Sequence, residues 1–335
     1  MKDSPDEIAS ILNLMLPVGP QQLPTGDLFI KKYYNNGILR TDMLTELKDR
    51  MKGRVSYLKT MESEIEKKFV GDKIGKLEHF KVYPGKMGEF QSEAYFKALE
   101  VDMKGKKGVY SNSRQASLFV FPDGSYGGSI FKNDIGFGKW LNYTKKLSIS
   151  RIGSDIKKRD IYSFNLGKKL KEKLIGSTPE ETLMNIGKYS KKYSQVLEKI
   201  LSNPDKTSFV YCKFVSGSGA ILFSKLLELF GFFSASGNSC KKGKRLRYGL
   251  LTNLTSSPKQ ISQIVDCFNK PENRNGDYIK VIIGSQLVSE GISFYNVQQE
   301  FILTPWFNYS ETEQALARGI RLGSHRELLK ENPNV

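Results

Sequence analysis

The chain has 335 residues, of which 39% are hydrophobic and 26% charged, as is typical of a globular protein with one or two compact domains. No apolar run is long enough to span a bilayer and the first residues lack a signal-peptide pattern, so we expect neither a membrane segment nor secretion. The 52 Lys and Arg residues outnumber 35 Asp and Glu residues, leaving a formal net charge of +17. This surplus favours nucleic acid as a partner, because phosphate contacts dominate its binding; a merely lysine-rich composition is the alternative.

The first hundred residues are predicted to be mainly helical. Ser4, Pro5 and Glu7 form a helix start, with the serine as N-cap and the proline in the first turn. The apolar run 8–16 continues this helix up to Pro17. Helical spacing resumes beyond a proline-rich loop, so residues 1–100 are expected to form one helical region.

Residues 101–177 are predicted to form a loop-rich insertion. Glycines multiply here, and the strand-like run 119–121 leads into the turn signature Pro122-Asp123-Gly124. Lysines gather between residues 157 and 173 among helix formers. We interpret them as a solvated face, with a dedicated binding surface as the alternative.

From residue 178 to 335, strands alternate with helices. Thr178 and Ser257 are predicted helix caps, a helix break is expected near Gly187, and Ser310 begins the last helix. The predicted strands are 208–214, 248–254, 278–283 and 300–303. Short connections between alternating strands and helices are typical of a parallel sheet covered on both faces, so an α/β domain is expected.

The last predicted helix carries a distinctive polar stripe. Gln314, Arg318 and Arg321 are spaced i, i+4 and i+7, which places them on one helix face. Arginine suits a phosphate clamp because its planar, permanently charged fork stabilises charge on phosphate oxygens. We expect this stripe at the carboxyl side of the sheet, where ligands bind in open α/β folds. An exposed polar face is the alternative.

The segment 284–294 follows the third predicted strand and is rich in glycine and serine. Its amides and hydroxyls are expected at the same sheet edge. The strip 241–247 carries five cationic residues in seven, and it is either a phosphate-contacting loop or a solvated one.

These segments resemble conserved motifs of the superfamily 2 helicases. Gln314 to Arg321 is similar to motif VI, Q-x-x-G-R-x-x-R, with Ala317 in place of the usual glycine. Gly284 to Phe294 resembles motif V, and Phe209 to Gly219 resembles motif IV and the turn after it. The resemblance implies that residues 178–335 form a RecA-like C-terminal helicase domain.

The resemblance also implies roles for individual residues. Arg318 and Arg321 would stabilise the transition state at the ATP γ-phosphate, and Gln314 would position the phosphates or water. Ser289, Glu290 and Gly291 would couple nucleotide to nucleic acid. The expected nucleic-acid contacts, some from motifs and some from the basic strip, are Gly217, Ser218, Ser285, Gln286, Lys241, Lys242, Lys244 and Arg245.

A closer resemblance is to the branch found in poxviruses, African swine fever virus and giant viruses, which includes the poxvirus early transcription factor ATPase and nucleoside triphosphatase. It rests on residues 52–58, 110–127, 289–292 and 318–325. It implies ATP and Mg²⁺ as cofactors, DNA as the partner with RNA as an alternative, and a viral RNA polymerase as a further partner. It also implies an intracellular place, in the host cytoplasm or the virion.

The sequence contains no G-x-x-x-x-G-K-[S/T] loop and no apolar strand ending in Asp-Glu. In the family these motifs belong to the first helicase lobe, which would hold the Mg²⁺. The start of the chain resembles the segment after motif III, so we expect a fragment that pairs with a missing N-terminal lobe and is inactive alone. The alternative is a non-catalytic, helicase-like subunit that binds nucleic acid in a transcription complex.

The three cysteines, Cys212, Cys240 and Cys267, lie far apart in the sequence and lack metal-ligand spacing. We expect free buried thiols and a reducing compartment. With only two histidines in the chain, no metal site is predicted.

Overall fold

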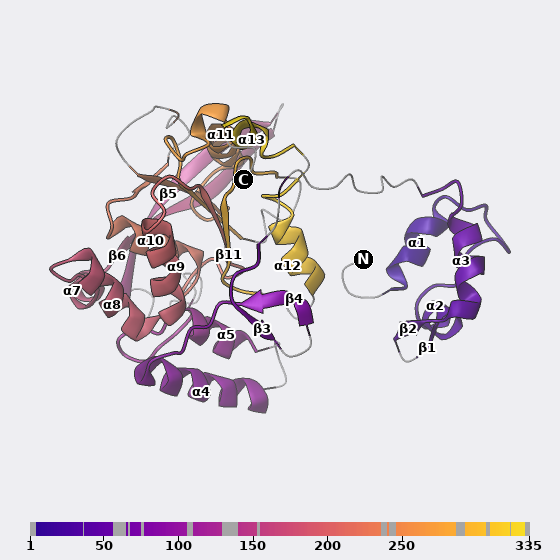
Figure 1. Cartoon of the computed structure of the whole chain (residues 1–335), viewed down its shortest axis with the longest axis horizontal. Helices are drawn as coiled ribbons and strands as arrows, with labels where there is room; N and C mark the ends of the chain where they lie inside the picture. Colours follow the sequence, from indigo (N-terminus) through magenta and orange to yellow (C-terminus); the bar gives the residue numbers. More distant parts are fainter. Residues whose placement is uncertain are drawn as a thin grey trace. The chain divides into compact units, whose positions relative to one another are not determined.

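The computed structural model describes residues 5–35, 37–55, 65, 68–74, 77–105, 110–128, 140–152, 155–235, 240, 246–285, 292–305, 309–321 and 323–331. The chain divides into two compact units, Met1–Ser63 and Glu64–Val335 (Figure 1). Neither boundary expected from the sequence, at residue 100 or 177, coincides with this division. Helix α4, Glu89–Lys104, runs across residue 100 and packs on α5, Ser111–Leu118.

The smaller unit is built around a compact apolar cluster that includes Ala9, Leu12, Phe29, Tyr33 and Leu47. Its elements are α1 (Glu7–Asn13), α2 (Asp27–Tyr33), β1 (Tyr34–Asn35), β2 (Ile38–Leu39), η1 (Thr41–Met43) and α3 (Leu44–Met51). Helix α1 begins close to the predicted start but ends four residues before Pro17. Ser4, the predicted cap, lies outside the described residues.

The first part of the larger unit contains strands that the sequence analysis did not expect. β3 (Asp72–Ile74) and β4 (Leu77–Val82) form one antiparallel hairpin. β5 (Leu141–Ile152) and β6 (Asp155–Leu166) form a much longer one, followed by α7 (Lys168–Leu174). Residues 157–166, which begin the lysine cluster, therefore lie in a strand although helix formers surround the lysines in the sequence. Tyr162, Phe164 and Leu166 alternate there with Ser163 and Asn165, and that period of two favours a strand.

The predicted parallel sheet is confirmed. Its strand order is β11-β7-β10-β9-β8, and every neighbouring pair is parallel. The strands are β7 (Ser208–Tyr211), β8 (Phe233–Ser234), β9 (Arg247–Leu251), β10 (Val281–Gly284) and β11 (Gln299–Ile302). The helices are α8 (Pro179–Tyr189), α9 (Lys191–Leu201), α10 (Ala220–Glu228), α11 (Pro258–Phe268), α12 (Tyr309–Leu316) and α13 (Arg326–Glu331), with a short turn η3 (Pro271–Asn273).

Two apolar layers cover the two faces of the sheet. Val210 belongs to the first layer and its neighbour Phe209 to the second, because successive strand residues point to opposite faces. Helices α9 and α10 lie on one side of the sheet and α12 on the other (Figure 1). The first layer also includes buried residues between Leu118 and Leu174, so the predicted insertion shares the core of the predicted C-terminal domain.

Side-chain caps fix the residues at which three of the helices that cover the sheet begin. The Thr178 hydroxyl accepts from the Glu181 amide, and Ser257 forms a full capping box with Gln260, as predicted. The break expected near Gly187 falls instead at Ser190. The Ser190 hydroxyl caps α9 by accepting from the Tyr193 amide at 3.0 Å.

Candidate functional site

The predicted stripe of Gln314, Arg318 and Arg321 is not formed. Helix α12 ends at Leu316, and both arginines lie in the turn that follows. The Arg318 amide bonds to the Ala315 carbonyl at 3.2 Å, which is the tight i→i−3 pattern of a helix end. Gln314, still on the helix, is exposed. The two arginines are therefore placed by the turn and its partners rather than by helical periodicity.

Both arginines contact the segment that enters β11. The Arg318 guanidinium donates to the Ile292 carbonyl at 3.4 Å, and the Arg321 guanidinium donates to the Ser293 hydroxyl at 2.7 Å. The Phe294 amide in turn donates to the Arg318 carbonyl at 2.9 Å. Residues that resemble motifs V and VI therefore form one hydrogen-bonded unit, which we name the arginine turn (residues 317–321 with 292–294).

The arginine turn lies toward the amino-terminal edge of the sheet, and the expected position at the carboxyl edge was wrong. Helix α12 starts beyond the carboxyl end of β11 and runs back for eight residues, about 12 Å at 1.5 Å per residue. This is about the length of a four-residue strand, so the helix returns the chain to the opposite edge. There, the Asn296 carbonyl accepts from the hydroxyl of Thr207, which directly precedes β7.

Gly319 lets the arginine turn approach β11 closely. A Cβ on Gly319 would lie 2.0 Å from Glu300 Oε1 and 3.2 Å from the Val297 side chain. The buried His325 ring holds the end of the turn, with Nε2 2.6 Å from the Val297 carbonyl and Nδ1 2.8 Å from the Ser324 hydroxyl. The arginine turn is thus packed closely against β11 and the residues just before it.

The electrostatics of the arginine turn favour an anion. Burial, and secondarily the nearby charge of Arg321, lower the pKa of Arg318. Arginine remains charged in proteins, so two like charges are held near each other. A phosphate group placed between them would relieve the repulsion and restore the lost solvation.

Gln286, Ser289, Glu290, Gly291, Lys241, Lys242, Lys244 and Arg245 lie outside the described residues. Ser285 is described: it is buried directly after β10, at the carboxyl edge of the sheet. The roles expected for Ser285 and for the residues outside the described part stay predictions.

Gly217 and Ser218 have contacts that point to a structural role. The buried Ser218 hydroxyl donates to the Phe119 carbonyl at 2.7 Å and accepts from the Gly127 amide at 2.8 Å. Gly217 has a φ of +62°, and a Cβ there would lie 2.2 Å from the Gly127 carbonyl oxygen. The turn after β7 therefore packs against the 119–128 segment. The nucleic-acid contacts expected at Gly217 and Ser218 stay predictions.

A polar cluster that the sequence analysis missed occupies the carboxyl edge of the sheet. Glu311, on the first turn of α12, accepts from Lys213 Nζ at 3.2 Å and from the Tyr211 hydroxyl at 3.3 Å. Arg114 donates to the Pro305 carbonyl at 3.3 Å, and Lys192 donates to the Leu303 carbonyl at 2.9 Å. These residues come from four separate stretches of chain, so no sequence spacing could have indicated the cluster.

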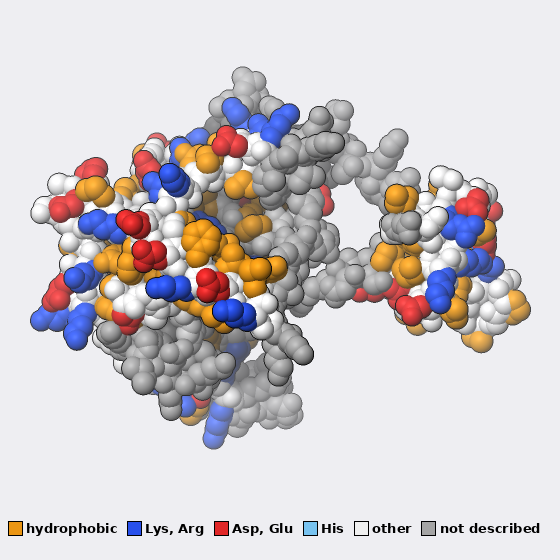
Figure 2. Space-filling view, turned by 90° about the horizontal axis from the view of Figure 1, so that it is seen from below, with side chains coloured by type: hydrophobic (Ala, Val, Ile, Leu, Met, Phe, Trp, Pro, Cys, Tyr) orange, Lys and Arg blue, Asp and Glu red, His pale blue; other side chains and the backbone are white. Residues whose placement is uncertain are grey.

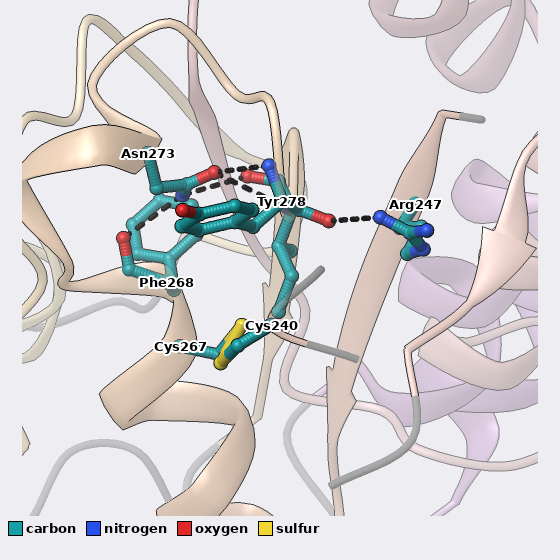
Figure 3. Close-up of a disulfide and its surroundings, with 7 residues drawn as sticks. Cys240, Arg247, Cys267, Phe268, Asn273 and Tyr278 are labelled. Carbon is teal, nitrogen blue, oxygen red and sulfur yellow. Dashed lines mark hydrogen bonds between the residues drawn. A yellow bond between two sulfur atoms is a disulfide. The ribbon is translucent and has the colours of Figure 1, made fainter. Parts of the chain in front are cut away.

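The expectation of three free thiols was wrong for two of them. Cys240 and Cys267 form a disulfide between the segment after β8 and helix α11 (Figure 3). Near the disulfide, the side-chain oxygen of Asn273 accepts hydrogen bonds from the Tyr278 and Ile279 amides. Two cysteines that lie 27 positions apart become neighbours only in the fold. Cys212 is free and buried, and burial raises the pKa of its thiol to about 12.

The comparisons with known proteins agree with this geometry. Residues 191–323 match the family described as helicase conserved C-terminal domain. The chain is 38% identical over 334 residues to putative helicase 087L of Invertebrate iridescent virus 3, covering 99% of this chain and 29% of the relative. It is 34% identical over 331 residues to putative helicase 009L of Frog virus 3, covering 98% of this chain and 29% of that relative. It is 29% identical over 333 residues to nucleoside triphosphatase I of Heliothis armigera entomopoxvirus, covering 92% of this chain and 44% of that relative.

A parallel five-stranded sheet, with an arginine turn where the motif VI resemblance falls, defines a RecA-like helicase C-terminal lobe. Residues 191–323 match the helicase conserved C-terminal domain, and nearly the whole chain is similar to helicases of large DNA viruses. It spans about 29% of the length of the first two relatives. Among the described residues, no helix is both long and apolar enough to cross a membrane.

Proposed function

We propose that this chain is the second lobe of an ATP-dependent nucleic-acid translocase that couples ATP hydrolysis to DNA binding or remodelling in viral transcription or replication. The observation that carries the proposal is the arginine turn, in which Arg318 and Arg321 are held near each other on residues 292–293. ATP with Mg²⁺ would be bound mainly by a first lobe that carries the phosphate-binding loop. Arg318 and Arg321 would reach the γ-phosphate from across the cleft between the lobes.

One edge of the sheet would contact the nucleotide and the other would contact nucleic acid. The amino-terminal edge carries the arginine turn, and Ser289, Glu290 and Gly291 precede it in the chain. The carboxyl edge carries Ser285, with Gln286 next in sequence. The basic strip 241–245 would add phosphate contacts to nucleic acid. The segment 285–293 would thus join the nucleic-acid edge to the nucleotide edge. A shift at one edge would be transmitted to the other through this one short segment.

The experiment measures ATP hydrolysis by the full-length protein that contains this lobe, with the Arg318→Ala substitution. Loss of an arginine finger lowers kcat by about 10³- to 10⁵-fold, so we expect a loss of that order with unchanged nucleic-acid affinity. Arg326→Ala is the matched control, since Arg326 is exposed on α13 and its removal changes the net charge equally. Normal turnover by the Arg318 variant would disprove the arginine-finger assignment.

A second candidate is a binding subunit that never hydrolyses ATP. It is favoured by the net charge of +17. It predicts salt-sensitive DNA binding that ATP does not alter. Measuring the affinity of the full-length protein for DNA with and without ATP separates the two candidates.

A further inference from the structure

The long hairpin β5–β6 is anchored to the core at its base and continues beyond it. Leu141, Phe164 and Leu166 at the base are buried in the first apolar layer. Each strand has 12 residues, about 40 Å at 3.4 Å per residue. The Tyr162 amide donates to the Leu254 carbonyl at 2.8 Å, which fixes β6 against the loop after β9. Beyond that point, the register continues for seven further residue pairs without a described core contact.

The two faces of this hairpin differ in chemistry. Directly paired residues share a face, so the register assigns every described side chain to one face or the other. The inner face carries the buried base residues and the aromatic contacts among Tyr143, Tyr162 and Phe164. The other face, which we name the outer face, carries Asn142, Thr144, Lys146, Ser148, Arg159, Ile161, Ser163 and Asn165.

The described part of the outer face is suited to phosphate contacts. Its amides and hydroxyls can donate hydrogen bonds, its cations are Lys146 and Arg159, and none of its described residues is a carboxylate. Lys146 and Arg159 are both exposed and occupy diagonal positions, since Lys146 pairs with Ile161 and Arg159 with Ser148. The carboxylate of Asp160 lies on the inner face, where Lys145 binds it at 2.8 Å. Over residues 141–166 as a whole, six Lys and Arg accompany two Asp.

This separation of charge contrasts with other parts of the surface. On the face of the molecule shown in Figure 2, Lys and Arg side chains alternate with Asp and Glu, and hydrophobic side chains lie between them. Mixed charge of that kind produces little net attraction for a polyanion. The outer face of the hairpin has cations without neighbouring described carboxylates, and so it is the stronger candidate for nucleic-acid contact.

We propose that the outer face of the β5–β6 hairpin binds the sugar-phosphate walls of the major groove of duplex DNA. This inference rests on the proposed function and assigns a binding surface outside the sheet edges. A two-stranded ribbon fits the major groove of B-form DNA, which is about 12 Å wide, whereas the major groove of A-form RNA is too deep and narrow. The aromatic side chains lie on the inner face, so the outer face offers no platform for stacking unpaired bases.

The competing explanation is that exposed lysines only protect the hairpin from edge pairing with other chains. That role does not depend on which face a lysine occupies. It predicts equal effects for substitutions on the inner and outer faces, and the DNA contact predicts unequal ones.

The test measures the affinity of the chain for a DNA duplex by fluorescence anisotropy across a range of salt concentrations. The outer-face variant is Lys146→Gln with Arg159→Gln, and the matched control is Lys145→Gln with Lys158→Gln on the inner face of the same strands. Each phosphate contact contributes about 0.9 to the slope of log K against log salt, so the outer-face variant should lose about two units of slope. The control should keep the slope of the unmodified chain.

Arg159 also donates to Asn253 at 3.1 Å, so its loss could affect folding. Lys146→Gln alone, compared with Lys158→Gln alone, keeps the test valid, and the expected loss is then about one unit of slope. Equal losses in the two variants would overturn the inference and leave the proposed function standing. Equal binding of RNA and DNA duplexes would also overturn it. Absence of salt-dependent DNA binding by the unmodified chain would overturn this inference, whereas the proposed function is tested separately by ATP hydrolysis of the full-length protein.

Discussion

The guanidinium of Arg321 donates a hydrogen bond to the hydroxyl of Ser293 at 2.7 Å and so joins two segments that lie 28 residues apart in the sequence. Ser293 is thereby positioned to hold Arg321 before any nucleotide binds. Side chains that are already oriented stabilise a transition state without the cost of reorganisation. Ser293 is therefore a positioning residue for the proposed arginine finger.

We expect Ser293→Ala to slow ATP hydrolysis by the full-length protein by about tenfold, because one hydrogen bond to a charged group contributes about 1.5 kcal/mol. The effect should appear in kcat rather than in KM. Ser293→Thr keeps the hydroxyl and should restore most of the rate. A rate for Ser293→Ala equal to that of the unmodified protein would show that the hydrogen bond does not position Arg321.

Gly217→Ala should destabilise the fold strongly. Its φ of +62° disfavours a side chain, and the added Cβ would lie 2.2 Å from the Gly127 carbonyl oxygen, which is backbone and cannot swing away. Gly124→Ala is the matched control, since its φ is +81° but no atom lies within 4 Å of the added Cβ. We expect the control to cost about 1 kcal/mol and Gly217→Ala at least twice that in urea unfolding. Similar losses of unfolding free energy in the two variants would show that the 119–128 segment does not pack tightly against Gly217.

Lys280 should make stability depend on pH in the alkaline range. Its side chain is 2% exposed, and Nζ donates to the Asn203 carbonyl at 2.7 Å and the Lys206 carbonyl at 2.9 Å. Burial lowers the pKa of this amine from 10.5 to about 8. Between these values the unfolded chain binds more protons than the folded one, so the free energy of unfolding rises with pH.

The measurement is urea unfolding from pH 7.5 to 10 for the unmodified chain and for Lys280→Met, which keeps the apolar stem. The stability of the unmodified chain relative to the variant should increase above pH 8. The comparison removes the contribution of other groups that titrate in this range. A constant difference across the range would mean that the folded amine titrates near its ordinary pKa.

The Cys240–Cys267 disulfide should contribute measurably to stability. The two residues are 27 positions apart, and closing a loop of that length is worth about 3.5 kcal/mol in the chain-entropy account. A reductant should therefore lower the free energy of unfolding of the chain by an amount of that order. The double variant Cys240→Ser, Cys267→Ser should be insensitive to reductant. An unmodified chain that is equally insensitive would favour the free thiols expected from the sequence.

Much of the sheet could be predicted because its determinants are local. The strands were indicated by short apolar runs, and the caps at Thr178 and Ser257 by residues within one helical turn. The β5–β6 hairpin was missed because its lysines resemble a helical surface, while its strand identity depends on burial of Leu141, Phe164 and Leu166 in a core formed largely by later residues. The extent of α12 was overestimated because the residues after Leu316 fit a helical pattern equally well.

The sequence by itself determined the class of fold and the identity of the arginines, because apolar periodicity and a short motif are both encoded by near neighbours. Only the tertiary structure decided where those arginines lie. Their position follows from the return of α12 along the sheet, the close approach of Gly319 to Glu300 and the hydrogen bond from Arg321 to Ser293. Each of these contacts joins residues separated by about 20 or more positions or depends on the length of a packed helix. Contacts of that kind arise when the chain closes on itself, and no local pattern specifies them.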